Sequence, residues 1–435
     1  MNARRWYLRG LSFAGLLLLL TAGGQHAGLV ARRGADDLQW IPPEDTTPLV
    51  AVTTVAFGAF RGLVADALWM RAAELQEEGQ HFELVQLATW ISHLAPTMPE
   101  VWEFQAWNLA YNISVLFADD SDRWRWVVHG LDLLRVDGLR HNPTAPSLFW
   151  NIGWIFQHKI GMDFDQSHLY YKTRLAQEAQ EIFADENWRS LVRDRLRMDP
   201  DGIEQLEGRF GPIDWQLPSA HALYWSSRGL RHLRRDAFNA RRLQRMRLQT
   251  LADLFRRGQL LTDADGAPVI ALPRFDLLPI LLEDFTGLLP DARFSDLATS
   301  ARRSLLAEAA LLLAAHLRTD EALDAWQQLA ELDPDVSPNP EAFQEFLAAS
   351  FLHQDPARLS REQMLLRLGA TLSLAREWDG IDEARARGLR TIARQDHRRY
   401  QITRLSPEHV ERTGLPPFEA IDLAIRTHQL PGEIL

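Results

Sequence analysis

The chain has 435 residues, of which 46% are hydrophobic and 24% are charged, a balance that favours a globular protein over extended disorder. The formal net charge of −11 argues against a general nucleic-acid binder, because such proteins need positive charge to face phosphate. The absence of cysteine excludes disulfides, thiolate metal sites and cysteine nucleophiles.

The first 31 residues have the pattern of an export signal. Arg4, Arg5 and Arg9 precede an apolar run from Leu11 to Ala22. A positive segment followed by a short apolar core is typical of a secretory signal, and an uncleaved one acts as an anchor. The paired arginines also resemble the twin-arginine pattern, so the export route stays open. We expect residues 1–31 to be a signal peptide or a membrane anchor.

This leader places the rest of the chain outside the cytoplasm. We expect the protein at a bacterial inner membrane, facing the periplasm, or free in the periplasm after cleavage. Residues 32–52 follow as a proline-containing tether, with Pro42, Pro43 and Pro48 among several acidic residues. Proline stiffens such a segment and does not favour packed structure.

From residue 53 onward the apolar residues follow a helical period. Between Leu305 and Leu313, for example, they fall at the spacing of one helix face. Proline lacks an amide donor and clashes with the preceding turn, so helices are expected to end shortly before Pro96, Pro143, Pro200 and Pro334.

One short β-hairpin is expected between Leu260 and Leu272. Its turn lies at Asp263-Ala264-Asp265-Gly266. The same four residues lack the third ligand position and the terminal glutamate of a calcium loop, so they are interpreted as a turn.

The helical segments resemble the tetratricopeptide family, whose unit of about 34 residues runs W-x2-L-G-x2-Y, then A-x3-F, then a closing proline. The matching positions are Phe149, Ile152, Gly153 and Phe156; more loosely Trp102 and Ala106; then Leu306, Ala309, Ala310 and Leu313 with Ala322, Trp326 and Pro334; and finally Leu365, Leu368, Gly369 and Leu372. Pro96 and Pro143 lie 47 residues apart, so the units carry insertions.

The resemblance implies an all-α fold, a superhelical array of antiparallel helical hairpins behind an N-terminal signal or anchor helix. We expect one array over residues 53–200 and another over residues 291–435. Between them, residues 201–290 form arginine-rich middle helices with the small hairpin. Small residues in the pattern let helices approach, and large ones fill the space between neighbours.

The sequence contains none of the common catalytic signatures, such as H-E-x-x-H, the phosphate-binding G-x4-G-K-[ST] or G-x-S-x-G. We therefore predict no catalytic residue, no cofactor and no metal site, and we expect a binding protein rather than an enzyme.

Three asparagines are candidates for ligand binding. In the tetratricopeptide family the first helix of each pair lines a concave groove, and asparagines there hold the ligand. By this resemblance, Asn108, Asn112 and Asn151 are groove candidates, and the first two share a helix face. The alternative is that all three hydrogen-bond inside the bundle.

A second candidate is the polar segment that starts at His158. It holds both lysines of the chain, and the proposed ligand contacts are Lys159, Asp163, His168 and Lys172. Such a cluster suits an anion site or a docking point, and the alternative is a structural network of salt bridges. Farther on, His221 and Trp225 share a helix face, in the core or in a groove.

A third candidate is a run of arginines in an acidic chain. Ten arginines and two aspartates lie between Arg228 and Arg257, a net charge of about +8. Arg234, Arg241 and Arg245 can share one stripe of a helix. The stripe suits anionic lipid headgroups or an acidic partner, and the alternative is a solvated face balanced by neighbouring acids.

Two functions compete on this evidence. The first is a membrane-tethered or exported scaffold that binds a protein or peptide partner in an envelope complex. The second is a helical envelope protein that binds or processes glycans, with its many tryptophans, such as Trp150 and Trp154, as stacking platforms. The alternative for the tryptophans is core packing. We favour the scaffold, because no carboxylate pair suited to glycoside hydrolysis stands out.

Overall fold

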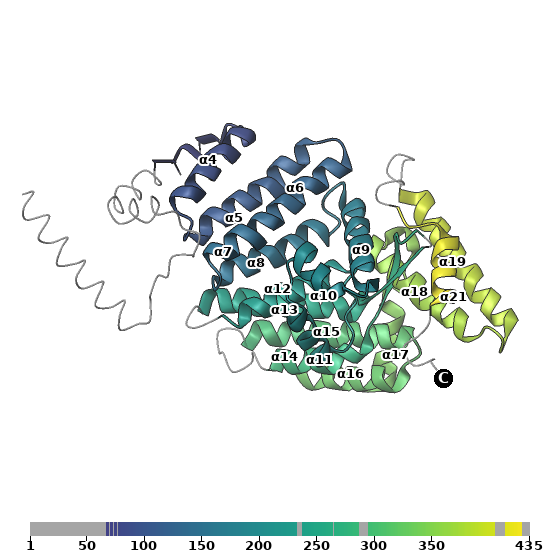
Figure 1. The fold of residues 1–435 in the computed structure, drawn as a ribbon. Coiled ribbons are helices and arrows are strands. Elements are labelled where there is room, and N and C mark those ends of the chain that lie inside the picture. Colours follow the sequence, from purple (N-terminus) through teal and green to yellow (C-terminus); the bar gives the residue numbers. More distant parts are fainter. Residues whose placement is uncertain are drawn as a thin grey trace, which may run out of the picture. The chain divides into compact units, whose positions relative to one another are not determined.

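The computed structural model describes residues 67–428, apart from residues 69, 73, 76, 233–236, 264, 287–294 and 405–413. The predicted leader, the tether and Arg234 lie outside the described residues. Helices make up most of the described part, and the expected all-α class is confirmed (Figure 1). None of the described helices combines the length and the hydropathy needed to cross a bilayer. The unit Ala65–Leu435 is compact in its own right.

The N-terminal helices pair through turns that the prolines define. They are α4 (His81–Leu94), α5 (Pro99–Trp107), the π-helical η1 (Asn108–Ile113), the 3-10 turn η2 (Ser114–Leu116), α6 (Asp120–Asp132), the π-helical η3 (Leu133–Gly138) and α7 (Leu139–His141). The two turns are tied together, because Trp102 Nε1 and Asn142 Nδ2 each donate to the Pro96 carbonyl over 2.8 Å.

The middle helices surround α12 and α13, which pack against each other and against α8. They are α8 (Pro146–Trp154), the π-helical η4 (Ile155–Ile160), α9 (His168–Ala184), α10 (Trp188–Leu191), the π-helical η5 (Val192–Leu196), α11 (Pro200–Phe210), α12 (Pro218–Leu230) and α13 (Ala237–Arg257).

The C-terminal part begins with the only strands of the described residues, β1 (Gln259–Thr262) and β2 (Pro268–Leu272). After them come the 3-10 turn η6 (Phe275–Leu277), α14 (Leu278–Thr286), α15 (Ser295–Ala315), α16 (Thr319–Leu332), α17 (Pro340–Ala349), the 3-10 turn η7 (Pro356–Arg358), α18 (Arg361–Glu377), α19 (Glu383–Arg404) and α21 (Phe418–Thr427). Short connections and side-by-side packing make α15 and α16 a helical hairpin.

The predicted helix ends agree with the structure. Helix α4 ends at Leu94, α7 at His141 and α16 at Leu332, each two residues before a proline. Pro200 has a second role, because it also occupies the first turn of α11, where its missing amide donor is harmless. Asp199 caps that helix by accepting from the Asp201 amide.

The expected β-hairpin is also present. Its strands are antiparallel, Leu261 opposite Ile270, with an irregularity next to Thr262. Asp263 Oδ1 closes the turn by accepting from the amides of Asp265 and Ala267. Gly266 takes a φ of 77°, which favours glycine. The carboxylate of Asp263 is therefore part of the turn itself.

Close contacts between helices depend on glycine. A Cβ atom on Gly153 of α8 would lie 2.5 Å from Met246 Sδ of α13, and one on Gly229 of α12 would lie 2.7 Å from Phe149 Cβ of α8. The small residue at the motif position of α8 thus lets three helices approach. In the C-terminal hairpin, Ala310 and Ala322 are likewise buried and Trp326 fills the gap beside them.

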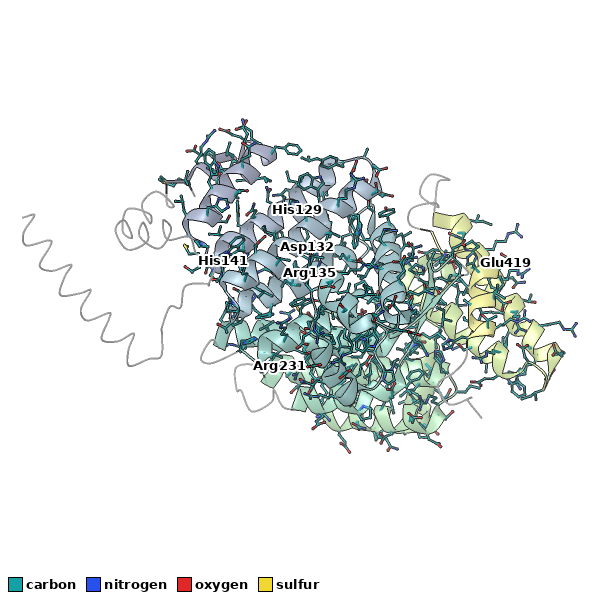
Figure 2. All side chains as sticks on the ribbon, in the orientation of Figure 1. His129, Asp132, Arg135, His141, Arg231 and Glu419 are labelled. Atoms are coloured by element: carbon teal, nitrogen blue, oxygen red, sulfur yellow. The ribbon has the colours of Figure 1, made fainter. Side chains whose placement is uncertain are left out.

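Among the described residues, the buried hydrophobic side chains form three clusters. The central core runs from Trp102 to Phe343 and includes the fully buried Trp225. The N-terminal core is small and lies around Leu84 and Ile91 of α4. The C-terminal core joins the β-hairpin to α18, α19 and α21. Side-chain hydrogen bonds also join the helices: Arg135, whose side chain is 5% exposed, donates to Asp132 Oδ1 and to the Leu196 carbonyl. Figure 2 shows where Arg135 and Asp132 lie.

Candidate functional site

A groove of about 2220 Å³ opens within the helical unit. Its walls come from α8, η4, α9, α12, α13, the β-hairpin, α14, α15, α18, α19 and α21, and α13 supplies more of the lining than any other element. Pockets for small ligands hold about 300–1,000 Å³, so this groove has room for a larger occupant, such as a segment of polypeptide.

The groove carries positive charge in an acidic chain. Seven of its lining residues are cationic and four are acidic. The cations are Lys172, Arg241, Arg242, Arg245, Arg256, Arg257 and Arg361, and the acids are Asp163, Asp253, Asp263 and Glu362. The lining therefore favours an anionic occupant, whereas the net charge of the whole chain does not.

Asp163 is the centre of one ion cluster. Its Oδ1 lies 2.5 Å from Lys172 Nζ and 3.0 Å from His168 Nδ1, and its Oδ2 lies 3.7 Å from an Nη of Arg361. Burial raises the pKa of Asp163, but the hydrogen bond from His168 and the charge of Lys172 outweigh it and hold the pKa well below its usual range.

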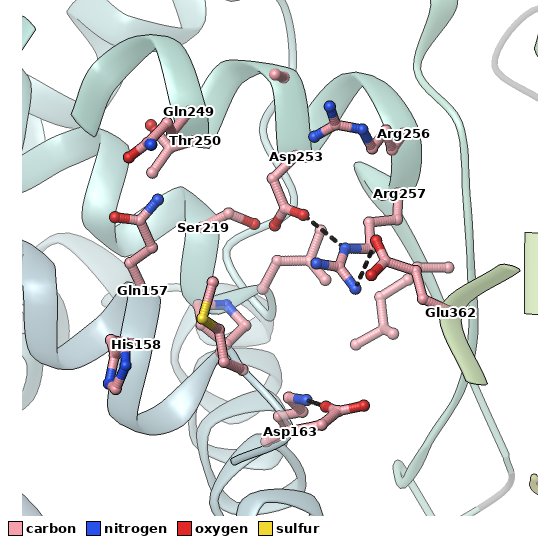
Figure 3. A pocket seen from close by; sticks show the side chains of 18 of the residues that line it. Gln157, His158, Asp163, Ser219, Gln249, Thr250, Asp253, Arg256, Arg257 and Glu362 are labelled. Atoms are coloured by element: carbon pink, nitrogen blue, oxygen red, sulfur yellow. Dashed lines mark hydrogen bonds and ion pairs between the residues drawn. The ribbon is translucent and has the colours of Figure 1, made fainter. Parts of the chain in front are cut away.

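Arg257 is the centre of the next ion cluster (Figure 3). It contacts Asp253 at 2.6 Å and Glu362 at 3.4 Å, while Arg256 pairs with Glu308 at 2.6 Å. The two clusters hold cations and carboxylates in nearly equal number. Their charges therefore cancel locally, and they tie α13 and η4–α9 to α18.

Three arginines at the other end of α13 remain outside these clusters. Arg241, Arg242 and Arg245 all line the groove. Arg245 is exposed, and no carboxylate of the described residues pairs with it, whereas its neighbour Arg247 pairs with Asp284. Arg242 lies with its guanidinium 3.5 Å from the centroid of Trp150, and burial lowers its pKa. The positive charge of the groove is therefore concentrated on this part of α13.

A column of stacked rings runs beside these arginines. The ring centroids of Trp150 and Trp154 lie 5.1 Å apart, those of Trp154 and His158 lie 4.8 Å apart, and both pairs are stacked. The column arises because the three residues recur every fourth position along α8 and η4. Trp154 has a ring on each side, and Trp150 has Trp154 on one side and Arg242 on the other. Their faces are thus covered.

Polar amides complete the same end of the groove. Gln157, Gln244 and Gln249 line it, and Figure 3 shows Gln157 and Gln249 on facing elements. Within the described part of the chain, the side-chain oxygen of Gln157 is buried without a hydrogen-bond partner. Such an orphaned acceptor is unfavourable, and a donor from an occupant relieves it.

The three candidate asparagines do not line this groove. Asn108 is buried, and its Oδ1 accepts from Asn112 Nδ2 over 3.0 Å. Asn151 Nδ2 donates to the Ser147 carbonyl one turn earlier in α8. These contacts match the alternative in which the amides bond inside the bundle.

The polar segment after His158 divides in two. Lys159 and Asp165 pair at 2.6 Å with their side chains 4% and 8% exposed, away from the groove lining. Asp163 and Lys172 line the groove, and His168 is buried beneath them. All four candidates have partners within the segment, as in the structural network that was the alternative.

His221 and Trp225 belong to the central core. His221 is fully buried, and its Nε2 lies 2.9 Å from the carbonyl oxygen of Trp215. Its ring stacks on that of Phe156, with 4.7 Å between the ring centroids. Burial lowers its pKa to about 4. Trp225 is also fully buried. Of the arginine candidates, Arg241 and Arg245 line the groove.

Several groove residues were not singled out from the sequence. Arg242 belongs to the same basic run as Arg241, so the sequence could have indicated it as a further binding residue. Trp150 and Trp154 were considered as platforms for sugars, whereas their spacing of four residues, continued by His158, indicates that they stack along a helix. Nothing in the sequence marks Gln157 or Glu362, whose roles depend on elements that meet only in the folded chain.

Within the described residues, no three or more histidine or acidic side chains come together as a metal site would require. Comparison of the sequence with protein-family models and with curated proteins finds no match.

Proposed function

We propose that the chain is a scaffold that binds a protein or peptide partner in an envelope complex, exported or held at the membrane by residues 1–31. Its architecture would be a divergent tetratricopeptide-like array of helical hairpins. The observation that carries the proposal is the arginine-rich wall of α13, which lines a groove larger than small ligands need.

The position of these arginines favours a polypeptide over a membrane surface. Arg241 and Arg245 lie in a groove between α8, α12, α15 and α18. A flat bilayer does not follow a concave wall, whereas an extended segment of a partner does. Binding within a groove is also how helical repeats commonly use their inner surface.

The glycan alternative has less support. A sugar stacks on an open ring face, and the faces of Trp150 and Trp154 are covered by neighbours. The groove carboxylates Asp163, Asp253 and Glu362 are each held by a cation. A glycosidase needs one carboxyl group to donate a proton and another to act as base or nucleophile.

A photo-crosslinking residue in place of Gln249 tests the proposal. Gln249 is exposed and lines the groove, whereas Gln327 is exposed on α16 outside it and gives a matched control position. In membranes of the producing cell, we expect one discrete cross-linked product from position 249 and none from 327. Equal products at both positions, or none at 249, would falsify binding in the groove.

A further inference from the structure

We infer that the groove takes an acidic, extended polypeptide segment, with its carboxylates on Arg242 and Arg245 and its backbone amides on the nearby glutamines. The inference rests on the proposed function and names the chemistry of the partner. It depends on three features of the same stretch of groove: an exposed arginine without a carboxylate partner among the described residues, a glutamine oxygen without a hydrogen-bond donor, and tryptophan rings that stack on their neighbours.

The first feature is the uneven distribution of charge. Lys172, Arg257 and Arg361 face Asp163, Asp253 and Glu362, so this end of the groove offers little net attraction. No carboxylate of the described residues pairs with Arg245, whereas Arg242 rests on the Trp150 ring and is also attracted by the charge of Glu103, which lies outside the groove lining. Carboxylates brought by an occupant would form charge-assisted hydrogen bonds here, which are the strong kind.

The second feature separates a peptide from other anions. The Gln157 oxygen needs a donor, and Gln244 and Gln249 offer further amides along the wall. Rotation about the soft terminal torsion of glutamine turns such an oxygen toward an occupant. A lipid headgroup phosphate offers acceptors alone, whereas an acidic peptide offers backbone N–H donors together with carboxylates.

The third feature concerns the shape of the occupant. Trp150 and Trp154 line the groove and stack on each other, on His158 and on Arg242, so an occupant meets their edges more readily than their faces. Ring edges carry partial positive charge, so they also favour carboxylate and carbonyl oxygens. Like charges along an acidic segment repel each other and keep it extended, which suits a groove whose lining spans many elements.

The test uses the purified full-length protein and fluorescein-labelled poly-glutamate, with poly-glutamine and poly-lysine of equal length as references. Fluorescence anisotropy at neutral pH should show that poly-glutamate binds and that the two reference polymers do not. Added salt should weaken the binding of poly-glutamate. The variant Arg242→Gln with Arg245→Gln should bind about a hundredfold more weakly, about tenfold for each charge-assisted contact.

Two controls keep this result interpretable. Arg193→Gln with Arg231→Gln removes the same charge from exposed positions outside the groove and should leave the affinity within about twofold. Arg242 stacks on Trp150, so its loss can disturb the fold. Arg245→Gln alone removes an exposed side chain without a carboxylate partner, and it should still weaken binding about tenfold.

Each other outcome overturns the inference. Equal affinity for poly-glutamate and poly-glutamine, or tighter binding of poly-lysine, would show that carboxylates are not recognised. Phosphatidylglycerol vesicles that displace the probe and lose binding in Arg245→Gln would assign the arginines to lipid. A partner cross-linked at position 249 while poly-glutamate fails to bind would leave the proposed function intact and reject the acidic segment.

Discussion

At the scale of single residues, the charged side chains of the groove fall into two groups. Those around Asp163 and Arg257 form ion pairs, whereas Arg245 of α13 has no carboxylate partner among the described residues. The density of polar groups between His158 and Lys172 predicted an anion site or a docking point, with a structural network of salt bridges as the alternative. Its partners were not predictable, because Arg123 reaches Asp165 from α6 and Arg361 reaches Asp163 from α18. Contacts between residues so distant in sequence depend on how the helices pack, which local patterns do not encode.

Asp165→Asn tests whether this network is structural. The change leaves Lys159 buried without its carboxylate, and removing one partner of a buried pair costs about 3–5 kcal/mol. We expect the free energy of unfolding, measured by urea titration, to fall by about 3 kcal/mol. The double variant Lys159→Met with Asp165→Asn should be more stable than the single one. The opposite order would contradict a buried pair.

His221 gives a prediction about pH. Burial lowers its folded pKa from 6.5 to about 4, so the unfolded state binds a proton in this window that the folded state does not. His221 therefore does not change the free energy of unfolding above about pH 6.5, and it lowers that free energy as the pH drops toward 4. The full loss is about 3 kcal/mol for this group.

The variant His221→Gln checks this assignment. Urea titrations between neutral pH and pH 4.5 should show a shallower loss of stability than in the parent. His316, whose pKa burial also lowers to about 4, should respond alike when changed to glutamine. The exposed His353→Gln should keep the parental slope. An unchanged slope in His221→Gln would contradict a neutral buried imidazole.

At the scale of elements, boundaries were predictable and orientations were not. The ends of α4, α7 and α16 and the β-hairpin follow from proline and turn chemistry, which act over a few residues. The π-helical turns, such as η4, were not foreseen, since their local sequence has no known signal. The arginine stripe of α13 was visible in the sequence, but its position in a groove depends on packing by α8 and α12.

Gly229→Ala tests the close approach of α12 and α8. The new methyl group would meet Phe149 Cβ at 2.7 Å, an atom that moves only with its backbone. Overpacking of this kind costs about 1–3 kcal/mol, and we expect a loss of that size in thermal or urea unfolding. Gly388→Ala in α19 meets no neighbouring atom and should instead stabilise by about 0.5–1 kcal/mol. Equal effects at the two glycines would reject the packing argument.

At the scale of the whole molecule, the described helices bury one large central hydrophobic core and two smaller ones. In the described part of the chain, the N-terminal core around Leu84 and Ile91 has few buried residues, whereas the central core joins α5 through α17. Composition and helical period were enough to predict a helical chain. The groove was not predictable, because its walls come from elements that extend from Trp150 to Ala420.

Hydrogen exchange followed by mass spectrometry should resolve these cores. We expect amides of α4 to exchange through local opening, with a lower free energy than amides of α8 and α12, because few buried contacts hold α4 in place. Uniform protection in all three helices would mean that the cores unfold as one cooperative unit.

The two lysines give the molecule an unusual chemical property. Lys159 is 4% exposed and held by Asp165, and Lys172 is 19% exposed and held by Asp163. Burial lowers the pKa of both amines, but the same burial keeps reagents away from them, and the sequence contains no other lysine. Acylating reagents should therefore spare the side chains of the folded chain and modify them once the turn between η4 and α9 opens. The extent of lysine acylation therefore measures how often that turn opens. In a complex, amine-directed reagents would modify the lysines of the partner rather than those of this chain.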